Sequence, residues 1–266
     1  MSTRIIAVDW SGRKTREAKY IWLAEARDGV LLRLEGGRDR EQIVKHLIEL
    51  QRSGDRLVAG LDFGFSLPEW FLRECGFGAA RELWRWLAAD GCADSLLRDR
   101  VSPFWGRGGT KKPSGIEHFR LTERVSPRVG AIGPKSIFQI NGAGAVGTGS
   151  VRGMRSLHAL VDDGFAIWPF DVAATSTVVE IYPRLLTGPV NKRDFRSRDD
   201  YLRKLGLEGD FLTTAASTED AFDAAVSAIA MSCHEAELSA LPAIDDRQLR
   251  IEGIIWWPGW REAHGC

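Results

Sequence analysis

Cysteine is scarce in this sequence of 266 residues, and no two cysteines lie close together along the chain. The four are Cys75, Cys92, Cys233 and Cys266. Their spacing does not match that of zinc ribbons or zinc fingers, which argues against a zinc site. The sequence therefore predicts reduced thiols in a cytoplasmic protein.

Long apolar runs and net charge are also missing. No segment approaches the length of a membrane span, and a strand-like run begins by residue 4, which leaves no room for a targeting segment. The 36 Lys and Arg residues balance the 36 Asp and Glu residues. Because non-specific nucleic-acid binding depends on basic residues, this balance argues against a dedicated protein of that class. We expect no membrane partner.

The basic residues are nevertheless concentrated between residues 98 and 135, a segment that contains nine Lys and Arg residues but only three acids. These nine are Arg98, Arg100, Arg107, Lys111, Lys112, Arg120, Arg124, Arg128 and Lys135. A basic segment on a neutral protein indicates a directed anion site. Six residues are candidate substrate ligands: Ser11, Lys111, Lys112, Arg120, Arg124 and Lys135. The alternative is a solvated loop.

Hydrophobic patterning predicts an α/β core in the first 62 residues. Apolar runs at 4–9 and 56–62 are typical of strands buried on both faces. Residues 19–27 and 30–34 predict a hairpin. Residues 39–54 predict a helix that Asp39 caps.

The pattern changes between residues 68 and 174, where Pro, Gly, Trp and Arg are frequent and helical stretches are short. We interpret 69–174 as a large insertion within a single domain that spans 1–266. The core resumes with a fifth strand at 177–182. A short helix at 198–205 and a long helix capped by Thr218 follow.

Carboxylates occupy the ends of these elements. Asp9 and Asp62 each end an apolar strand, and Glu180 lies near the end of the fifth strand. Asp220 and Asp223 lie three residues apart on one face of the long helix. Acids that converge without basic partners raise each other's pKa values, and Mg²⁺ or Mn²⁺ removes that penalty.

The chain order is that of a ribonuclease H-like mixed sheet, in which three antiparallel strands precede parallel ones and strands one and four are neighbours. The chain also resembles domain-of-unknown-function family 429, described as predicted ribonuclease H-like nucleases. The matching motifs are VDWSG at 8–12, GLDFGFSLP at 60–68, EIYP at 180–183, DAFDA at 220–224 and EGII at 252–255. Gly64 departs from the family pattern, where Pro is expected. The late helix is also similar to the final helix of Holliday-junction resolvases.

This resemblance implies a ribonuclease H-like fold with flanking helices, an insertion between strands four and five, and a nuclease site. The implied catalytic residues are Asp9, Asp62, Glu180 and Asp223, and the implied metal ligands are Asp9, Asp62, Asp220 and Asp223. Each acid also has a structural interpretation. Asp9 could be a turn residue, Glu180 could pair with Arg184, and Asp220 suits the first turn of any helix.

Residues 142–147 match the pattern Gly-x-Gly-x-x-Gly, and Asp171 follows at a distance close to that of a dinucleotide-binding fingerprint. Gly147, Thr148, Gly149 and Gly153 make a poor helical stretch, which argues against that interpretation. We expect instead a glycine-rich loop that contacts a phosphate backbone or packs against the core.

Together these features predict a Mg²⁺- or Mn²⁺-dependent phosphodiester hydrolase that acts on nucleic acid through an Asp/Glu two-metal site. One alternative is a hydrolase of the same fold acting on a nucleotide or small phosphorylated molecule, as in the actin-like ATPases. The other is a non-catalytic module that binds nucleic acid or protein.

Overall fold

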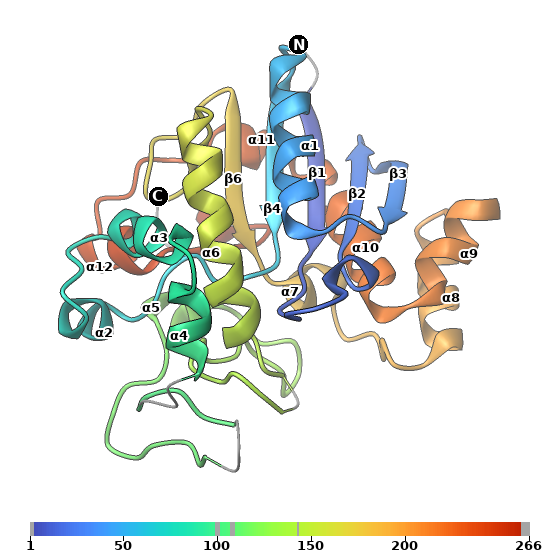
Figure 1. Cartoon of the computed structure of the whole chain (residues 1–266). Helices are drawn as coiled ribbons and strands as arrows, with labels where there is room; N and C mark the ends of the chain where they lie inside the picture. Colours follow the sequence, from blue (N-terminus) through green and yellow to red (C-terminus); the bar gives the residue numbers. More distant parts are fainter. Residues whose placement is uncertain (1–2, 99–101, 107–109, 143, 262–266) are drawn as a thin grey trace.

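The computed structural model describes residues 3–98, 102–106, 110–142 and 144–261. Arg100, Arg107 and Cys266 lie outside the described residues, whereas Cys75, Cys92 and Cys233 are free thiols. A seven-stranded mixed sheet lies at the centre (Figure 1). Its strands are β1 (Thr3–Asp9), β2 (Trp22–Arg27), β3 (Val30–Gly36), β4 (Arg56–Leu61), β5 (Ala166–Ile167), β6 (Ser176–Ile181) and β7 (Ile255–Trp256).

The strand order is β3-β2-β1-β4-β6-β5, and β7 also pairs with β6. The pairs β1–β2 and β2–β3 are antiparallel, whereas β1–β4, β4–β6, β5–β6 and β6–β7 are parallel. The predicted side-by-side placement of the first and fourth strands is confirmed. The carboxyl ends of β1, β4 and β6 consequently lie at one edge of the sheet.

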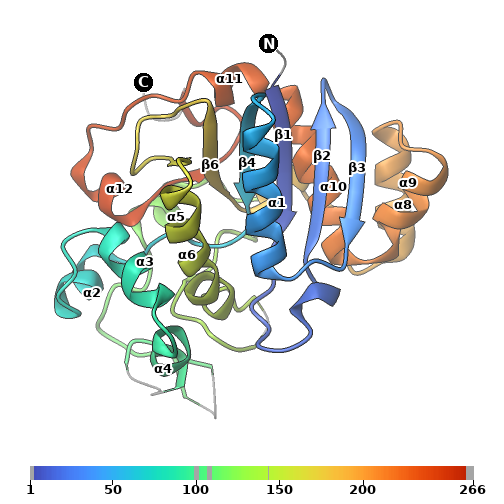
Figure 2. The ribbon, with the colours of Figure 1, turned by 45° about the horizontal axis from the view of Figure 1, so that its top comes forward.

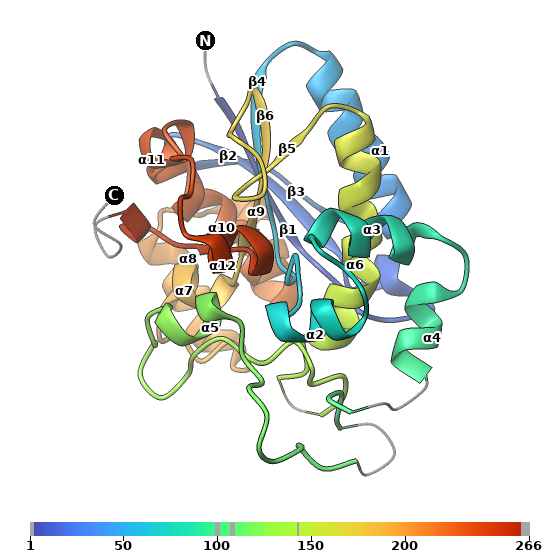
Figure 3. The ribbon, with the colours of Figure 1, turned by 90° about the vertical axis from the view of Figure 1, so that its left-hand side faces the viewer.

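Helices cover both faces of this sheet, as Figure 3 shows. The longer helices are α1 (Arg40–Arg52), α6 (Gly147–Asp162), α8 (Phe195–Lys204) and α10 (Glu219–Cys233). The shorter ones are η1 (Glu17–Lys19), α2 (Glu69–Glu74), α3 (Ala80–Ala88), α4 (Cys92–Arg98), α5 (Leu121–Val125), α7 (Pro183–Thr187), α9 (Gly209–Ser217), α11 (Glu235–Ser239) and α12 (Arg247–Glu252). Helices α1, α3 and α6 lie on one face, α10 lies on the other, and α8 and α9 lie near β3 (Figure 2).

The core is divided by the sheet into two layers. Ile6 and Val8 of β1 belong to the layer under α1 and α6, and Ile5 and Ala7 belong to the layer under α10. All four side chains are fully buried. Since alternate residues of a strand face opposite sides, a strand in this position needs an uninterrupted apolar run, which is what the sequence shows.

Two helix starts follow the local sequence signals. Asp39 caps α1 by accepting from the Gln42 N–H at 2.8 Å, and the Gln42 side chain accepts from the Asp39 N–H at 2.9 Å. Thr218 caps α10 by accepting from the Ala221 N–H at 3.0 Å. Both predicted caps are confirmed.

The prediction that 147–153 is a poor helical stretch is wrong, because α6 spans Gly147–Asp162. A Cβ on Gly147 would lie 2.1 Å from the Ile137 carbonyl oxygen, and one on Gly153 would lie 2.7 Å from the Phe63 ring. Close packing therefore selects glycine here and outweighs its low helix propensity. Helix α6 and strand β5 both lie within the predicted insertion, 69–174, and both pack on the sheet.

Candidate functional site

Four acids lie near the carboxyl ends of β1 and β4. Asp9 is the last residue of β1, and Asp62 directly follows β4, where its N–H donates to the Val8 carbonyl oxygen at 3.0 Å. Asp220 and Asp223 lie in the first two turns of α10, which packs on β1. Asp9 and Asp223 are each only 8% exposed, and Asp62 and Asp220 are partly buried.

These acids share one electrostatic environment. Burial raises the pKa of Asp9 well above its ordinary value, and the charges of Asp62, Asp223 and Asp220 raise it further. Burial together with Asp223 raises the pKa of Asp62 to about 8. Burial also raises the pKa values of Asp220 and Asp223. Mutual influence of this kind requires that the four side chains lie near one another, as the resemblance implied.

Lys192 is part of this group, although no pattern in the sequence indicates it. Its Nζ contacts the Asp223 Oδ2 atom, and its charge lowers the pKa values of Asp9, Asp62 and Asp223 against the effect of burial. Lys192 lies between α7 and α8, in a stretch of polar residues typical of exposed loops. Only the folded chain places it beside the acids.

Tyr182 is a second neighbour that the sequence did not indicate. It directly follows β6, and burial followed by the charge of Asp62 raises its pKa to about 12. Its hydroxyl therefore keeps its proton at neutral pH, and it donates to the Gly133 carbonyl oxygen at 3.4 Å.

Glu180 and Arg120 have a different role from the one expected. Arg120 donates from Nη1 and Nη2 to the two carboxylate oxygens of Glu180, at 2.9 and 2.5 Å. It also donates from Nε to Glu123 at 2.7 Å, and the Phe65 N–H donates to Glu180 at 2.8 Å. Both side chains of the Arg120–Glu180 pair are at least 97% buried.

The consequence is that Arg120 is occupied by protein carboxylates. Although burial alone would lower its pKa, Glu123 and Glu180 raise it above the ordinary value. Glu180 pairs with Arg120 and not with Arg184, and both of its oxygens are engaged. Arg120 and Glu180 thus form a buried ion pair in the wall of the cavity described below.

The other predicted substrate ligands do not form one surface. Ser11 is buried, and Arg124 pairs with Glu117 at 3.4 Å. Lys111 and Lys112 are exposed, and the Lys112 Nζ lies 5.7 Å from the Trp105 ring centroid. Among the predicted basic ligands, Lys135 is the one that has no ion-pair partner in the described residues and also lines a cavity together with Asp62.

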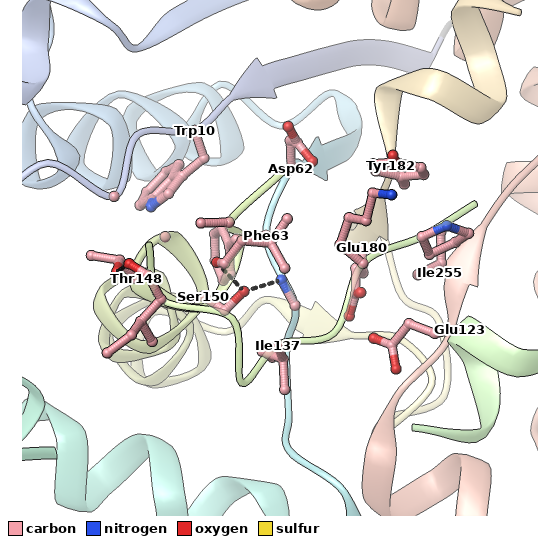
Figure 4. Close-up of a pocket in the computed structure, with 18 of the residues that line it drawn as sticks. Trp10, Asp62, Phe63, Glu123, Ile137, Thr148, Ser150, Glu180, Tyr182 and Ile255 are labelled. Atoms are coloured by element: carbon pink, nitrogen blue, oxygen red, sulfur yellow. Dashed lines mark hydrogen bonds between the residues drawn. The ribbon is translucent and has the colours of Figure 1, made fainter. Parts of the chain in front are cut away.

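That cavity has a volume of about 550 Å³ and opens beside Asp62 (Figure 4). Its walls come from the residues after β1 and β4, the start of α6, and the residues around β6 and β7. They include Trp10, Arg13, Phe63, Lys135, Ile137, Thr148, Gly149, Ser150, Tyr182 and Ile255. The Ser150 hydroxyl holds one wall together by accepting from the Gly64 N–H at 2.9 Å and donating to the Val146 carbonyl at 3.0 Å.

The acids fit a hard divalent cation by donor type. The Asp223 Oδ1 atom is buried and has no hydrogen-bond partner in the described part of the chain. Coordination of a cation by this oxygen would satisfy it. Among the described residues, no set of three or more His, Cys, Asp and Glu side chains forms a ready-made metal site. Mg²⁺ does not need one, because it is commonly held by one or two carboxylates, waters and substrate phosphate oxygens.

Comparison of the chain with protein-family models, curated proteins and solved structures found no match. Within the described residues, no helix is long and apolar enough to cross a membrane.

Proposed function

We propose that the protein is a divalent-metal-dependent phosphodiester hydrolase of ribonuclease H-like fold that acts on nucleic acid. The observation that carries this proposal is the convergence of buried Asp9 and Asp223, from β1 and α10, with partly buried Asp62 at the end of β4. Acids of raised pKa grouped at a sheet edge are characteristic of functional sites. If these acids had only a structural role, replacing them with uncharged residues would remove their mutual repulsion and stabilise the fold.

The fold supports the same proposal. Three antiparallel strands, parallel central strands and a late helix are compatible with the arrangement that the motif resemblance implies. In that arrangement the first strand and the last helix bring their acids together, and β1 and α10 do so here.

The residues have distinct roles in this proposal. Asp9 and Asp62 hold the cation from the strand ends, and Asp223 supplies its unpartnered Oδ1. Asp220 adds negative charge at the rim. When bound, Mg²⁺ or Mn²⁺ supplies Lewis-acid stabilisation of the charge that develops on the phosphodiester. Lys192 balances the acids before the cation binds, and Tyr182 forms part of the cavity wall that also contains Asp62.

The cavity beside Asp62 favours a second candidate, a nucleotide or other small phosphorylated substrate. A volume of about 550 Å³ lies within the range of small-molecule sites. The neutral net charge agrees with this candidate.

The first test is a calorimetric titration with Mn²⁺ of the wild type, Asp9→Asn and Asp223→Asn. We expect binding in the wild type and none in either variant. Asp245→Asn, which changes an exposed acid elsewhere, is the matched control. Because asparagine resembles the protonated carboxyl that burial favours at position 9, the fold should persist, and circular dichroism checks this.

Cleavage assays with Mn²⁺ then compare single-stranded, duplex, hybrid and branched nucleic acids with nucleotides. Turnover that Asp9→Asn abolishes supports the proposal, and the preferred substrate decides between the two candidates. Mn²⁺ binding that survives in both acid variants, or metal-independent turnover, contradicts the metal site. Salt-sensitive nucleic-acid binding without turnover would point to a non-catalytic module.

A further inference from the structure

The start of α6 forms part of the cavity wall and presents backbone donors without acceptors. Within the described residues, no acceptor bonds to the N–H groups of Thr148 and Gly149, and no side chain caps the helix. The first turn contains no acidic residue. A helix of sixteen residues also carries a partial positive charge at this end, which favours anions.

A second observation points to a ligand at the same place. The Trp10 side chain lines the cavity and is 8% exposed, and its indole Nε1–H is buried without a hydrogen-bond partner in the described part of the chain. Figure 4 shows the nitrogen edge of this indole turned toward Thr148 at the start of α6. An unpaired buried donor costs free energy unless a ligand or water accepts from it.

The indole is held firmly in that orientation. Its ring centroid lies 4.8 Å from that of Phe63. Gly12, two residues after Trp10, packs directly against the start of α6. A Cβ at this position would lie only 2.5 Å from the Gly149 nitrogen. This close approach of two backbones brings the loop after β1, and with it Trp10, to the donors of the helix.

Positive charge is available on the same cavity wall. Lys135 lines the cavity, and no ion pair holds it within the described residues. Arg13 lines it as well, with its guanidinium 3.8 Å from the Tyr20 ring centroid. Three acids also line the wall: Glu123 and Glu180 are paired with Arg120, and Asp62 belongs to the acid group described above.

We infer that this end of the cavity binds a phosphate group of the substrate, with Trp10 Nε1–H and the N–H groups of Thr148 and Gly149 donating to its oxygens and Lys135 supplying charge. The inference rests on the proposed function for the identity of the phosphate as part of a substrate. This inference accounts for the glycine-rich sequence at 142–149 without a dinucleotide-binding fold. Such a fold requires a β-strand before the glycines, and in the described residues the segment before residue 142 forms only an isolated bridge, between Trp105 and Gln139.

The test measures binding by calorimetry in EDTA at low salt, with inorganic phosphate, a trinucleotide that carries a 5′-phosphate and the same trinucleotide without it. We expect the phosphorylated trinucleotide to bind about tenfold more tightly than the other, and inorganic phosphate to compete with it. Trp10→Phe keeps the packing but removes the donor, and should weaken phosphate binding about tenfold. Lys135→Gln should weaken it by a similar factor.

Gly149→Ala separates loss of the site from loss of the fold. Its Cβ would lie 3.7 Å from the Gly12 nitrogen, an ordinary contact, and alanine favours the helix. We expect this variant to be at least as stable as the wild type and to bind phosphate more weakly, because the new methyl group enters the donor cluster. Trp86→Phe on α3 and Lys45→Gln on α1 are matched controls that should change nothing.

Two outcomes would overturn the inference: equal binding of the two trinucleotides, or phosphate binding that Trp10→Phe, Lys135→Gln and Gly149→Ala leave unchanged. Because this experiment contains no metal, its result is independent of the Mn²⁺ titration. Mn²⁺ binding without phosphate binding removes only the subsite, and phosphate binding without Mn²⁺ binding removes only the proposed metal chemistry.

Discussion

Asp62→Asn should make the metal-free protein less sensitive to alkaline pH. The pKa of Asp62 is about 8 in the folded protein, against an ordinary value of 3.8. Between these two values the folded state holds a proton that the unfolded state has lost. Stability is therefore greatest at low pH and falls as pH rises toward about 8. Asparagine cannot ionise, so the variant should lack this dependence.

The expected magnitude follows from the size of the pKa difference. One bound proton changes the free energy of unfolding by about 1.4 kcal/mol per pH unit, so the interval from pH 5 to pH 8 gives at most about 4 kcal/mol. Asp9 and Asp223 titrate together with Asp62, and the proton belongs partly to the whole group. We expect Asp62→Asn to gain about 2 to 4 kcal/mol relative to the wild type across this interval.

Urea denaturation in EDTA at pH 5, 6, 7 and 8 measures this difference. Asp245→Asn, at an exposed position, serves as the control and should follow the wild type. Addition of Mn²⁺ should restore the stability of the wild type at pH 8 and have no such effect on Asp62→Asn. Parallel pH profiles for the wild type and Asp62→Asn would refute the argument that burial and neighbouring acids hold a proton on this side chain.

Three further changes test other parts of the structure. Glu180→Gln removes a buried anionic partner of Arg120 and should cost about 3 kcal/mol in urea denaturation. Gly147→Ala should lower Tm clearly, because its Cβ would lie 2.1 Å from a backbone carbonyl oxygen, whereas Gly149→Ala should not. Lys192→Gln should destabilise the metal-free protein by about 1 kcal/mol at pH 8 and by less at pH 5, where Asp62 carries a proton because its pKa is about 8; an equal loss at both pH values would contradict its electrostatic role.

The elements that could be predicted are those with a strong local signal. Strand β1 follows from an unbroken apolar run, and α1 and α10 begin where Asp39 and Thr218 cap them. The convergence of Asp9, Asp62 and Asp223 could be anticipated because adjacent parallel strands end at the same edge. In each case a few neighbouring residues, or one rule of topology, contain the necessary information.

The features that could not be predicted depend on contacts between distant segments. The helix propensity of residues 147–153 is poor, and only the contact of Gly153 with Phe63 explains why glycine is retained there. Arg120 reaches Glu180 across 60 residues, and no spacing in the sequence indicates that pairing. Lys192 has an ordinary polar neighbourhood in the sequence, and only the packing of the loop before α8 makes it part of the acid group.

The framework around Arg120 has a consequence for how the protein is made. Arg120 donates to the Glu252 carbonyl oxygen at 2.9 Å, and the Glu252 side chain accepts from the N–H groups of Leu121 and Glu69 at 2.6 and 2.7 Å. A ribosome adding about 5 to 20 residues per second needs roughly 7 to 26 seconds to synthesise the 132 residues that separate Arg120 from Glu252. During that time the arginine lacks a partner that its burial requires. We therefore expect the nascent chain to complete this part of the cavity wall only after Glu252 has been synthesised.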